Sequence, residues 1–244
     1  MCAVLDAVVL EAKGVSAGYR RHAQGLRDVS FSICAGEMVG LIGANGAGKS
    51  TLLKGMLGLE VPVSGFVRFW GKPLDEVRRR IAYVPQRGAV NWDFPTTVSD
   101  VVLMGRYAHI GLFRRPKSAD REIAREALAE MKLTELSDRQ ISELSGGQKQ
   151  RVFIARALAQ ESDLYLMDEP LAGVDETTER IVMDKFVALQ KEKKTVIAVH
   201  HDLSTLDDYF DYLVVLNRTV KACDYLSAMD KSAKIALAFR PKER

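Results

Sequence analysis

The hydrophobic positions of this chain follow two different spacings, and the spacing changes along its length. In the first third, short apolar or alternating segments lie between glycine-containing breaks, at residues 8–11, 29–33, 37–42, 66–70 and 81–84. Such segments are typical of β-strands, because successive side chains point to opposite faces of a sheet. We therefore predict that this part of the chain is rich in strands.

A helical period replaces this pattern in the middle of the chain. Residues 119–131 place Ala124, Leu128 and Met131 on one face of a predicted amphipathic helix. Ser118 precedes this helix and is the expected N-terminal cap.

The final third alternates between the two patterns. Short apolar strands are predicted at residues 164–167, 195–199 and 212–216, and a helix at residues 176–191. That helix carries Val182, Phe186 and Leu189 at the spacing i, i+4, i+7. Strands that alternate with helices predict a mostly parallel sheet covered by helices. The fold class is therefore α/β, with a helical region inserted into the core.

A second helix start lies within the apolar stretch AVNWDFPTTVSDVVLMG. Thr97 and Asp100 have the spacing of a capping box, in which each side chain binds a backbone N–H group near the other residue. The helix behind this cap is expected to bury Val101, Val102 and Met104.

Composition narrows the functional classes. A net charge of +3 is too small to favour nucleic-acid binding by itself, because basic and acidic residues are interspersed. No apolar stretch approaches the roughly 18 residues needed to span a bilayer. A role at a membrane would therefore depend on a separate membrane-spanning chain.

The segment LIGANGAGKST, residues 41–51, carries the first candidate chemistry. Gly43, Gly48, Lys49 and Ser50 fit the pattern G-x-x-x-x-G-K-[ST] between a predicted strand and a predicted helix. Glycines allow a tight loop whose N–H groups converge on one anion, and the helix N-terminus favours negative charge. The segment predicts a nucleotide-phosphate site, in which Lys49 provides positive charge and Ser50 a hydroxyl for Mg²⁺.

Two adjacent acids end a later apolar strand, in the segment LYLMDEP. Asp168 is the expected Mg²⁺ partner, and Glu169 the expected general base for an attacking water. The segment LSGGQKQR lies between this strand and the phosphate-binding loop at residues 41–51, which we call the P-loop. Its second residue, Ser145, is the predicted cap of a helix that starts near Gly146. Its glycines expose N–H groups at the positive helix end and so predict a second anion site.

The order of P-loop, Gln86, LSGGQ, LYLMDEP and His201 resembles the ATP-binding-cassette (ABC) ATPases over residues 10–216. This resemblance implies an α/β P-loop NTPase core with a mostly parallel sheet, an antiparallel β subdomain and an inserted α-helical subdomain. It divides the chain into a first part of the ATP-binding core at residues 1–87, a helical subdomain with the signature motif at 88–160, and a second part of the core at 161–244.

The resemblance also implies residue roles. The expected ATP-binding residues are Tyr19, Gly43, Asn45, Gly46, Gly48, Lys49, Ser50 and Thr51. The expected catalytic residues are Lys49, Gln86, Glu169 and His201, and the expected Mg²⁺ site consists of Ser50, Gln86 and Asp168. The signature residues Ser145, Gly146, Gly147 and Gln148 are expected to serve the ATP held by a second copy of the chain.

Two further roles fall to a loop acid and to one of two adjacent histidines. Asp175 matches the loop acid that crosses the dimer interface, although its loop, LAGVD, departs from the sequence common in the superfamily. In the segment VHHDL, the family's switch histidine immediately precedes an acid, so His201 matches it rather than His200. Adjacent histidines at a strand end rarely point at one ion, which disfavours a metal site there.

The same resemblance implies partners. Two cassettes would pack head to tail around ATP, on the cytoplasmic face of the cell membrane, beside a multi-span permease subunit. Trp92, Phe94 and Pro95 are the expected contacts with that permease, because apolar surface patches usually mark interfaces. The sequence from VPQRGAVNWDFP to GLFRRP is similar to that of cassettes of manganese, zinc and iron importers that depend on a solute-binding protein.

Three alternatives remain open at this point. The chain could serve an importer of another cargo, such as an iron chelate. It could be a soluble ABC ATPase of DNA repair or translation, but it shows neither a long coiled-coil insertion nor a second cassette. It could be an exporter cassette, which is often fused to a membrane domain. No nucleic-acid partner is expected.

Overall fold

The computed structural model describes residues 8–17, 25–59, 63–86, 88, 95–111 and 114–229. Tyr19, Trp92 and Phe94 lie outside these residues, so their predicted roles stay predictions. The chain forms two compact units: residues 1–78 together with 192–244, and residues 79–191. The three-part division at 87/88 and 160/161 also stays a prediction.

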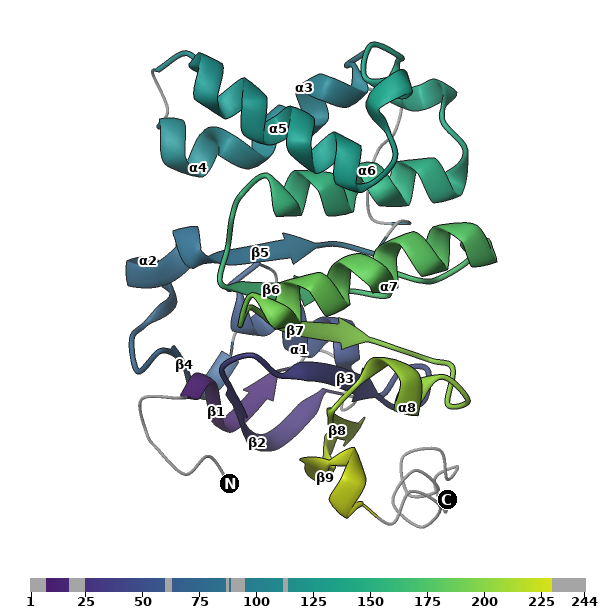
Figure 1. Ribbon diagram of the computed structural model, residues 1–244. Helices are drawn as coiled ribbons and strands as arrows, with labels where there is room; N and C mark the ends of the chain where they lie inside the picture. Colours follow the sequence, from purple (N-terminus) through teal and green to yellow (C-terminus); the bar gives the residue numbers. More distant parts are fainter. Residues whose placement is uncertain are drawn as a thin grey trace. The chain divides into compact units, whose positions relative to one another are not determined.

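An antiparallel sheet opens the first unit. Its strands β1 (Val8–Ala17), β2 (Leu26–Cys34) and β4 (Val63–Phe69) lie in the order β2-β1-β4 (Figure 1). Val29 and Phe31 alternate with exposed residues on β2, so one face of that strand is buried. The apolar alternation of the sequence therefore corresponds to a half-buried antiparallel sheet.

A parallel arrangement forms the rest of the first unit. The strands β7 (Thr195–Val199), β3 (Met38–Ile42) and β8 (Tyr212–Asn217) pair in parallel, and β9 (Thr219–Tyr225) adds an antiparallel edge to β8. All five residues of β3 are buried, as expected for a central parallel strand. Helix α1 (Lys49–Met56) follows β3, and the short helices α2 (Leu74–Val77) and α8 (Leu206–Tyr209) complete the described part of the unit.

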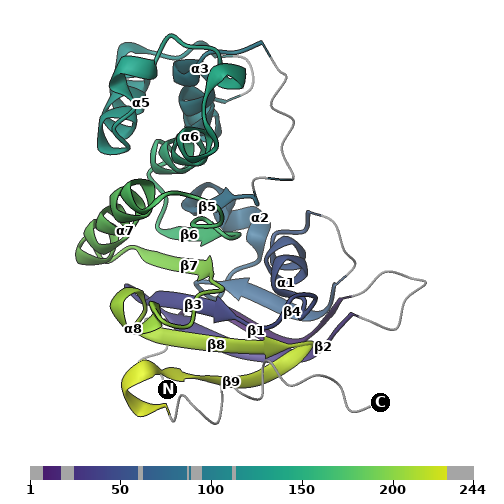
Figure 2. The ribbon, with the colours of Figure 1, turned by 90° about the vertical axis from the view of Figure 1, so that its right-hand side faces the viewer.

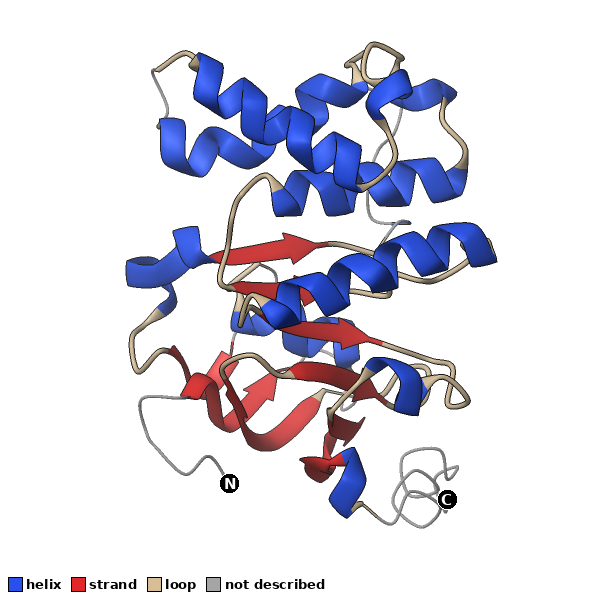
Figure 3. Cartoon of the chain, in the orientation of Figure 1, coloured by secondary structure: helices blue, strands red, loops and turns tan. Residues whose placement is uncertain are grey.

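The second unit combines a parallel strand pair with helices. Strand β5 (Ile81–Val84) pairs with β6 (Leu164–Met167). Its helices are α3 (Val98–Leu103), α4 (Tyr107–Ile110), α5 (Ser118–Glu130), α6 (Gly146–Leu158) and α7 (Glu176–Lys191). Helices α3, α5 and α6 pack on one another, as Figures 2 and 3 show, and α7 contacts α6.

A buried arginine ties this helical packing together. Arg106 is only 6% exposed, and its guanidinium forms ion pairs with Asp120 at 3.3 Å and Glu161 at 2.6 Å. It also donates to the carbonyl of Ala159 at the C-terminal end of α6, at 2.8 Å. A buried charge is tolerated when it is paired and hydrogen-bonded in this way. The sequence pattern gave no sign of this network.

Most predicted elements match the observed ones, with two corrections. Residues 81–84, 164–167, 176–191 and 195–199 form the predicted strands and helix with the predicted bounds. Ser118 is wrong as a cap, because it is the first residue of α5; Asp120 instead accepts the backbone N–H of Lys117 at 3.0 Å. Met104 is also wrong as a core residue, because it is 36% exposed where α3 has ended.

Candidate functional site

The P-loop connects the buried strand β3 to helix α1 in the first unit. Gly48 has a left-handed backbone conformation, with φ at 99°, and a Cβ atom there would lie 2.6 Å from Leu26 Cδ2. A Cβ atom on Gly43 would lie 2.1 Å from the carbonyl oxygen of Leu216. Both positions therefore require glycine, one of them for conformation and both for close approach.

Lys49 is folded against this loop. Its side chain is buried, and Nζ donates to the carbonyl of Gly43 at 2.7 Å and to that of Ala44 at 3.1 Å. No side chain in the described residues caps the start of α1. A helix start of this kind directs backbone N–H groups and a positive dipole toward an anion, and Lys49 adds a full charge beside them.

The two predicted acids follow strand β6 in the second unit. Asp168 is fully buried, and its N–H donates to the carbonyl of Val84 at 2.9 Å. Glu169 has a left-handed backbone conformation, with φ at 55°, which is uncommon for a residue other than glycine. Backbone strain of this kind tends to occur at functional positions, where it aims a side chain.

Glu169 is joined to a second predicted catalytic residue. Gln86, just after β5, donates from Nε2 to Glu169 Oε2 at 2.7 Å. The two residues are 83 positions apart in the sequence, and the β5–β6 pairing brings their strand ends to the same edge. The hydrogen bond gives the Glu169 carboxylate a defined orientation.

The signature helix α6 begins with the predicted capping box. Ser145 Oγ accepts the N–H of Gln148 at 3.3 Å, and the Gln148 side chain accepts the N–H of Ser145 at 2.9 Å. Two N-terminal N–H groups are therefore satisfied within the motif itself. Both glycines of the motif lie in the first turn of the helix.

Asp175 caps helix α7 beside this motif. Its carboxylate accepts the N–H of Thr178 at 2.9 Å and the hydroxyl of Thr178 at 3.1 Å. These hydrogen bonds to Thr178 hold the pKa of Asp175 below its ordinary value. A Cβ atom on Gly147 would lie 3.0 Å from Thr178 Oγ1 and 3.2 Å from Asp175 Oδ2, so the second glycine allows α6 to approach this cap.

The segment VHHDL places its two histidines in different environments. His201 is exposed, whereas His200 is 6% exposed and follows directly on strand β7. The sequence prediction distinguished the two residues by their order alone. The structure adds that only the first is part of the core of the first unit.

The described residues contain neither a group of three or more His, Cys, Asp and Glu side chains that could hold a metal ion nor a helix long and apolar enough to cross a membrane. The residues named above thus form a glycine-rich loop suited to a phosphate, a pair of acids at a strand end, and a capped helix start.

These features define a P-loop nucleoside triphosphatase. The family model described as ABC transporter matches residues 26–172. The chain belongs to the ABC transporter family, and it is an ATP-binding ATPase of the α/β P-loop class.

Relatives and solved structures agree with this assignment. The manganese transport system ATP-binding protein MntB of Bacillus subtilis is 52% identical over 208 residues, covering 85% of this chain and 83% of the relative. The zinc transport system ATP-binding protein TroB of Treponema pallidum is 50% identical over 216 residues, covering 88% and 81%. A dimeric post-hydrolysis structure of an ATP-binding cassette with ADP and phosphate is similar at a TM-score of 0.78, with 28% identity over 90% of this chain and 100% of that one.

Sequence reasoning missed three features of the site. The Gln86–Glu169 hydrogen bond and the contact of Gly147 with the Asp175 cap depend on pairings that no local pattern reveals. The burial of His200 had a weak signal, because it directly follows a wholly apolar strand.

Proposed function

We propose that this chain is the ATP-hydrolysing subunit that powers a membrane importer of a divalent transition metal, with manganese and zinc as the first candidates and iron as a further one. The proposal depends on one observation: about half of the aligned residues are identical to those of the manganese transport protein MntB and of the zinc transport protein TroB. The ions would be cargo of the membrane subunit. They would not be ligands of this chain.

The site residues have distinct proposed roles in ATP hydrolysis. Lys49 and the loop N–H groups bind the phosphates, and Tyr19 stacks on the adenine. Glu169 takes a proton from the attacking water at its carboxylate, a role worth about 10²–10⁴ in rate. His201 contacts the terminal phosphate and orients that water. The hydrogen bond from Gln86 supports this assignment, because it holds the Glu169 carboxylate in one orientation.

Mg²⁺ is the proposed metal cofactor. The hydroxyl of Ser50, the amide of Gln86 and the carboxylate of Asp168 are oxygen donors, which Mg²⁺ prefers. Such sites use one or two carboxylates and complete their coordination with substrate phosphates and water, so a dedicated cluster of acids is not required. When bound, Mg²⁺ would neutralise charge on the phosphate oxygens.

A second copy of the chain is the proposed partner in catalysis. The signature residues from Ser145 to Gln148 would bind the ATP held by the other copy, and Asp175 would lie at the interface. The preformed capping box supports this role, because it holds the first turn of α6 in place before a phosphate arrives. ATP would then bridge the copies, so that nucleotide binding closes the dimer.

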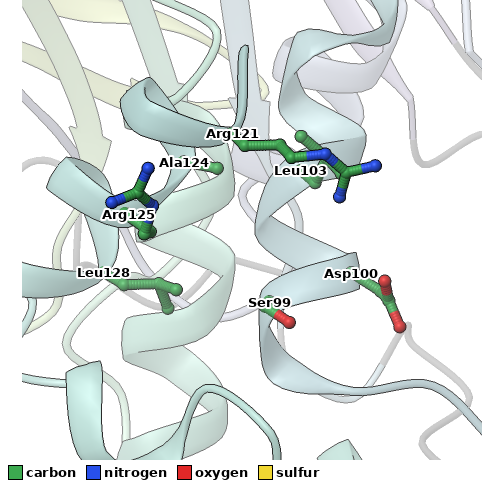
Figure 4. A pocket seen from close by; sticks show the side chains of 7 residues that line it. All are labelled: Ser99, Asp100, Leu103, Arg121, Ala124, Arg125 and Leu128. Atoms are coloured by element: carbon green, nitrogen blue, oxygen red, sulfur yellow. The ribbon is translucent and has the colours of Figure 1, made fainter. Parts of the chain in front are cut away.

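A multi-span permease subunit is the proposed attachment site, and it would hold this chain at the cytoplasmic face of the membrane. A solute-binding protein would act indirectly, through the permease. Pro95 is exposed and precedes α3. A pocket of about 190 Å³ is lined by residues of α3 and α5. Its lining residues are Ser99, Asp100 and Leu103 of α3 and Arg121, Ala124, Arg125 and Leu128 of α5; in Figure 4, Arg121 extends beside Leu103, and Asp100 points away from α5.

The pocket lining combines apolar side chains with the charged groups of Asp100, Arg121 and Arg125, which suits a short amphipathic segment of the permease. Co-purification with the permease tests the contact. Arg121→Glu and Trp92→Ala should reduce the amount of permease recovered, whereas Arg139→Glu, an exposed arginine outside the pocket lining, should not. Full recovery with both test variants would contradict this docking surface.

Transport tests the proposed cargo. Cells lacking this chain should lose uptake of radioactive manganese or zinc, and the wild-type chain should restore it, whereas Glu169→Gln should not. Normal uptake of both ions together with lost uptake of an iron chelate would favour the alternative importer. Normal uptake of all three would favour a soluble ABC ATPase outside transport.

A further inference from the structure

The loop that carries His201 is closed by the histidine beside it. His200 Nε2 lies 2.8 Å from Thr205 Oγ1, and the backbone N–H of His200 donates to the carbonyl of Leu41 at 3.2 Å. Residues 201–204, including His201, therefore lie between a buried imidazole and the threonine that binds it. Leu41 belongs to β3, the strand that leads into the P-loop.

The hydrogen-bond directions can be assigned from the partners. The Thr205 hydroxyl donates to the carbonyl of Asp202 at 3.4 Å, which leaves its oxygen to accept from His200. We therefore assign His200 Nε2 as the donor in this hydrogen bond. Asp202 in turn accepts the N–H and the hydroxyl of Ser204, at 2.8 Å and 2.6 Å. The loop is thus held at its base by His200 and within its turn by Asp202.

The imidazole ring is also fixed by packing. Its centroid lies 5.3 Å from that of Phe210 and 6.1 Å from that of Tyr209, both in tilted or edge-on arrangements. Phe210 occupies the space beside Gly40 on β3, where an added Cβ atom would lie 3.1 Å from Phe210 Cγ. An imidazole bonded to Thr205 and packed against Tyr209 and Phe210 has little freedom to move, so it can hold Thr205 in a fixed position.

We propose that His200 is a positioning residue for ATP hydrolysis, which acts through Thr205 to hold the loop that presents His201. The inference rests on the proposed role of His201 and assigns a separate function to the histidine that the family motif does not use. It acts on the turnover step, because misplacing a group that orients the attacking water slows the reaction without removing the nucleotide site.

The test uses ATP hydrolysis by the purified full-length chain, with substitutions that spare the buried ring. Thr205→Val removes the hydroxyl at nearly constant volume, and Thr205→Ser restores it. Thr195→Val is the matched control: Thr195 Oγ1 accepts the N–H of Gly36 at 3.0 Å, at the opposite end of β7 from His200. This control loses a part-buried hydrogen bond to a threonine hydroxyl, as the test variant does, without changing the loop.

We expect Thr205→Val to lower kcat about three- to tenfold, the range for loss of one hydrogen bond, with the KM for ATP changed less than about twofold. Thr205→Ser should restore kcat. Thr195→Val should lower the unfolding temperature and leave kcat unchanged. A kcat for Thr205→Val equal to that of the wild type, or an equal loss with Thr195→Val, would overturn the proposal.

A double variant separates this proposal from the one on which it rests. If Thr205 acts through His201, Thr205→Val should cause no further loss of kcat in a His201→Ala background. The same fold-loss in both backgrounds would overturn the positioning role. Full turnover by His201→Ala alone would instead refute the proposed role of His201.

Discussion

Two helices of this chain begin at glycine-rich segments for which we propose anion binding, and their N-termini are built differently. Helix α1 begins at Lys49 after a left-handed glycine, and no described side chain caps it. Helix α6 begins after Ser145 and is closed on itself by the capping box with Gln148. The first start relies on a charged side chain beside the loop, and the second on neutral groups of its own motif.

The difference indicates a division of labour. At the P-loop, Lys49 already lies against the Gly43 and Ala44 carbonyls, so a full positive charge is in place before nucleotide binds. At α6 the dipole alone favours an anion, and the helix is stable in its absence. The first site is therefore suited to hold ATP by itself, and the second to recognise ATP that another surface already holds.

Among tests that compare the two helix starts, the largest effect is expected at Lys49. Lys49→Ala should weaken ATP binding about 10- to 100-fold, because a charge-assisted hydrogen bond to phosphate is worth roughly 1.5–3 kcal/mol. Equilibrium binding of a fluorescent ATP analogue to the isolated chain measures this. Lys54→Ala, in the last turn of the same helix, is the control and should bind normally. Unchanged affinity in Lys49→Ala would remove the asymmetry between the two sites.

A smaller effect is expected at the capped site. Ser145→Ala removes one half of the capping box and should lower the free energy of unfolding by about 1 kcal/mol. ATP binding by the isolated chain should be unchanged, while ATP-dependent dimerisation, measured by analytical ultracentrifugation, should be reduced. Ser142→Ala, an exposed serine outside the box, is the matched control. Weakened ATP binding by the isolated Ser145→Ala chain would contradict the division of labour.

The smallest effect concerns the cap that the second site abuts. The pKa of Asp175 is lowered by its hydrogen bonds to Thr178, so the folded state favours the ionised carboxylate. Its contribution to stability is present above the unfolded pKa of about 3.9 and is lost as the pH falls through the lower folded value. Asp175→Asn should flatten this acid limb of the stability curve, measured by urea unfolding between about pH 5 and 2. An unchanged pH dependence would show that the cap does not contribute.

The sequence predicted the parts of these sites that depend on local pattern. Spacing within a few residues predicts the Ser145 cap and the Thr97–Asp100 capping box, and both are confirmed. It also predicts the bounds of β6, β7 and α7, which are confirmed as well. The Ser118 cap failed because the helix already begins at Ser118, and the side chain of Asp120 accepts the N–H of the preceding Lys117.

Features that depend on pairing between distant segments could not be predicted. Gln86 reaches Glu169 because two parallel strands end together, and Arg106 is buried because two separate segments, at Asp120 and at residues 159–161, supply its partners. A buried arginine is tolerated only when its partners surround it in the folded chain, so the residues next to Arg106 in the sequence do not predict its burial. The exposure of Met104 likewise depends on where α3 ends.

The turnover of Glu169→Gln tests whether Glu169 is the general base with which this chain hydrolyses ATP. This variant keeps the shape of the side chain and its contact with Gln86 while removing the basic oxygen. Steady-state phosphate release should fall about 10²- to 10⁴-fold with ATP still bound. Phosphate release at the wild-type rate would show that Glu169 is not the general base.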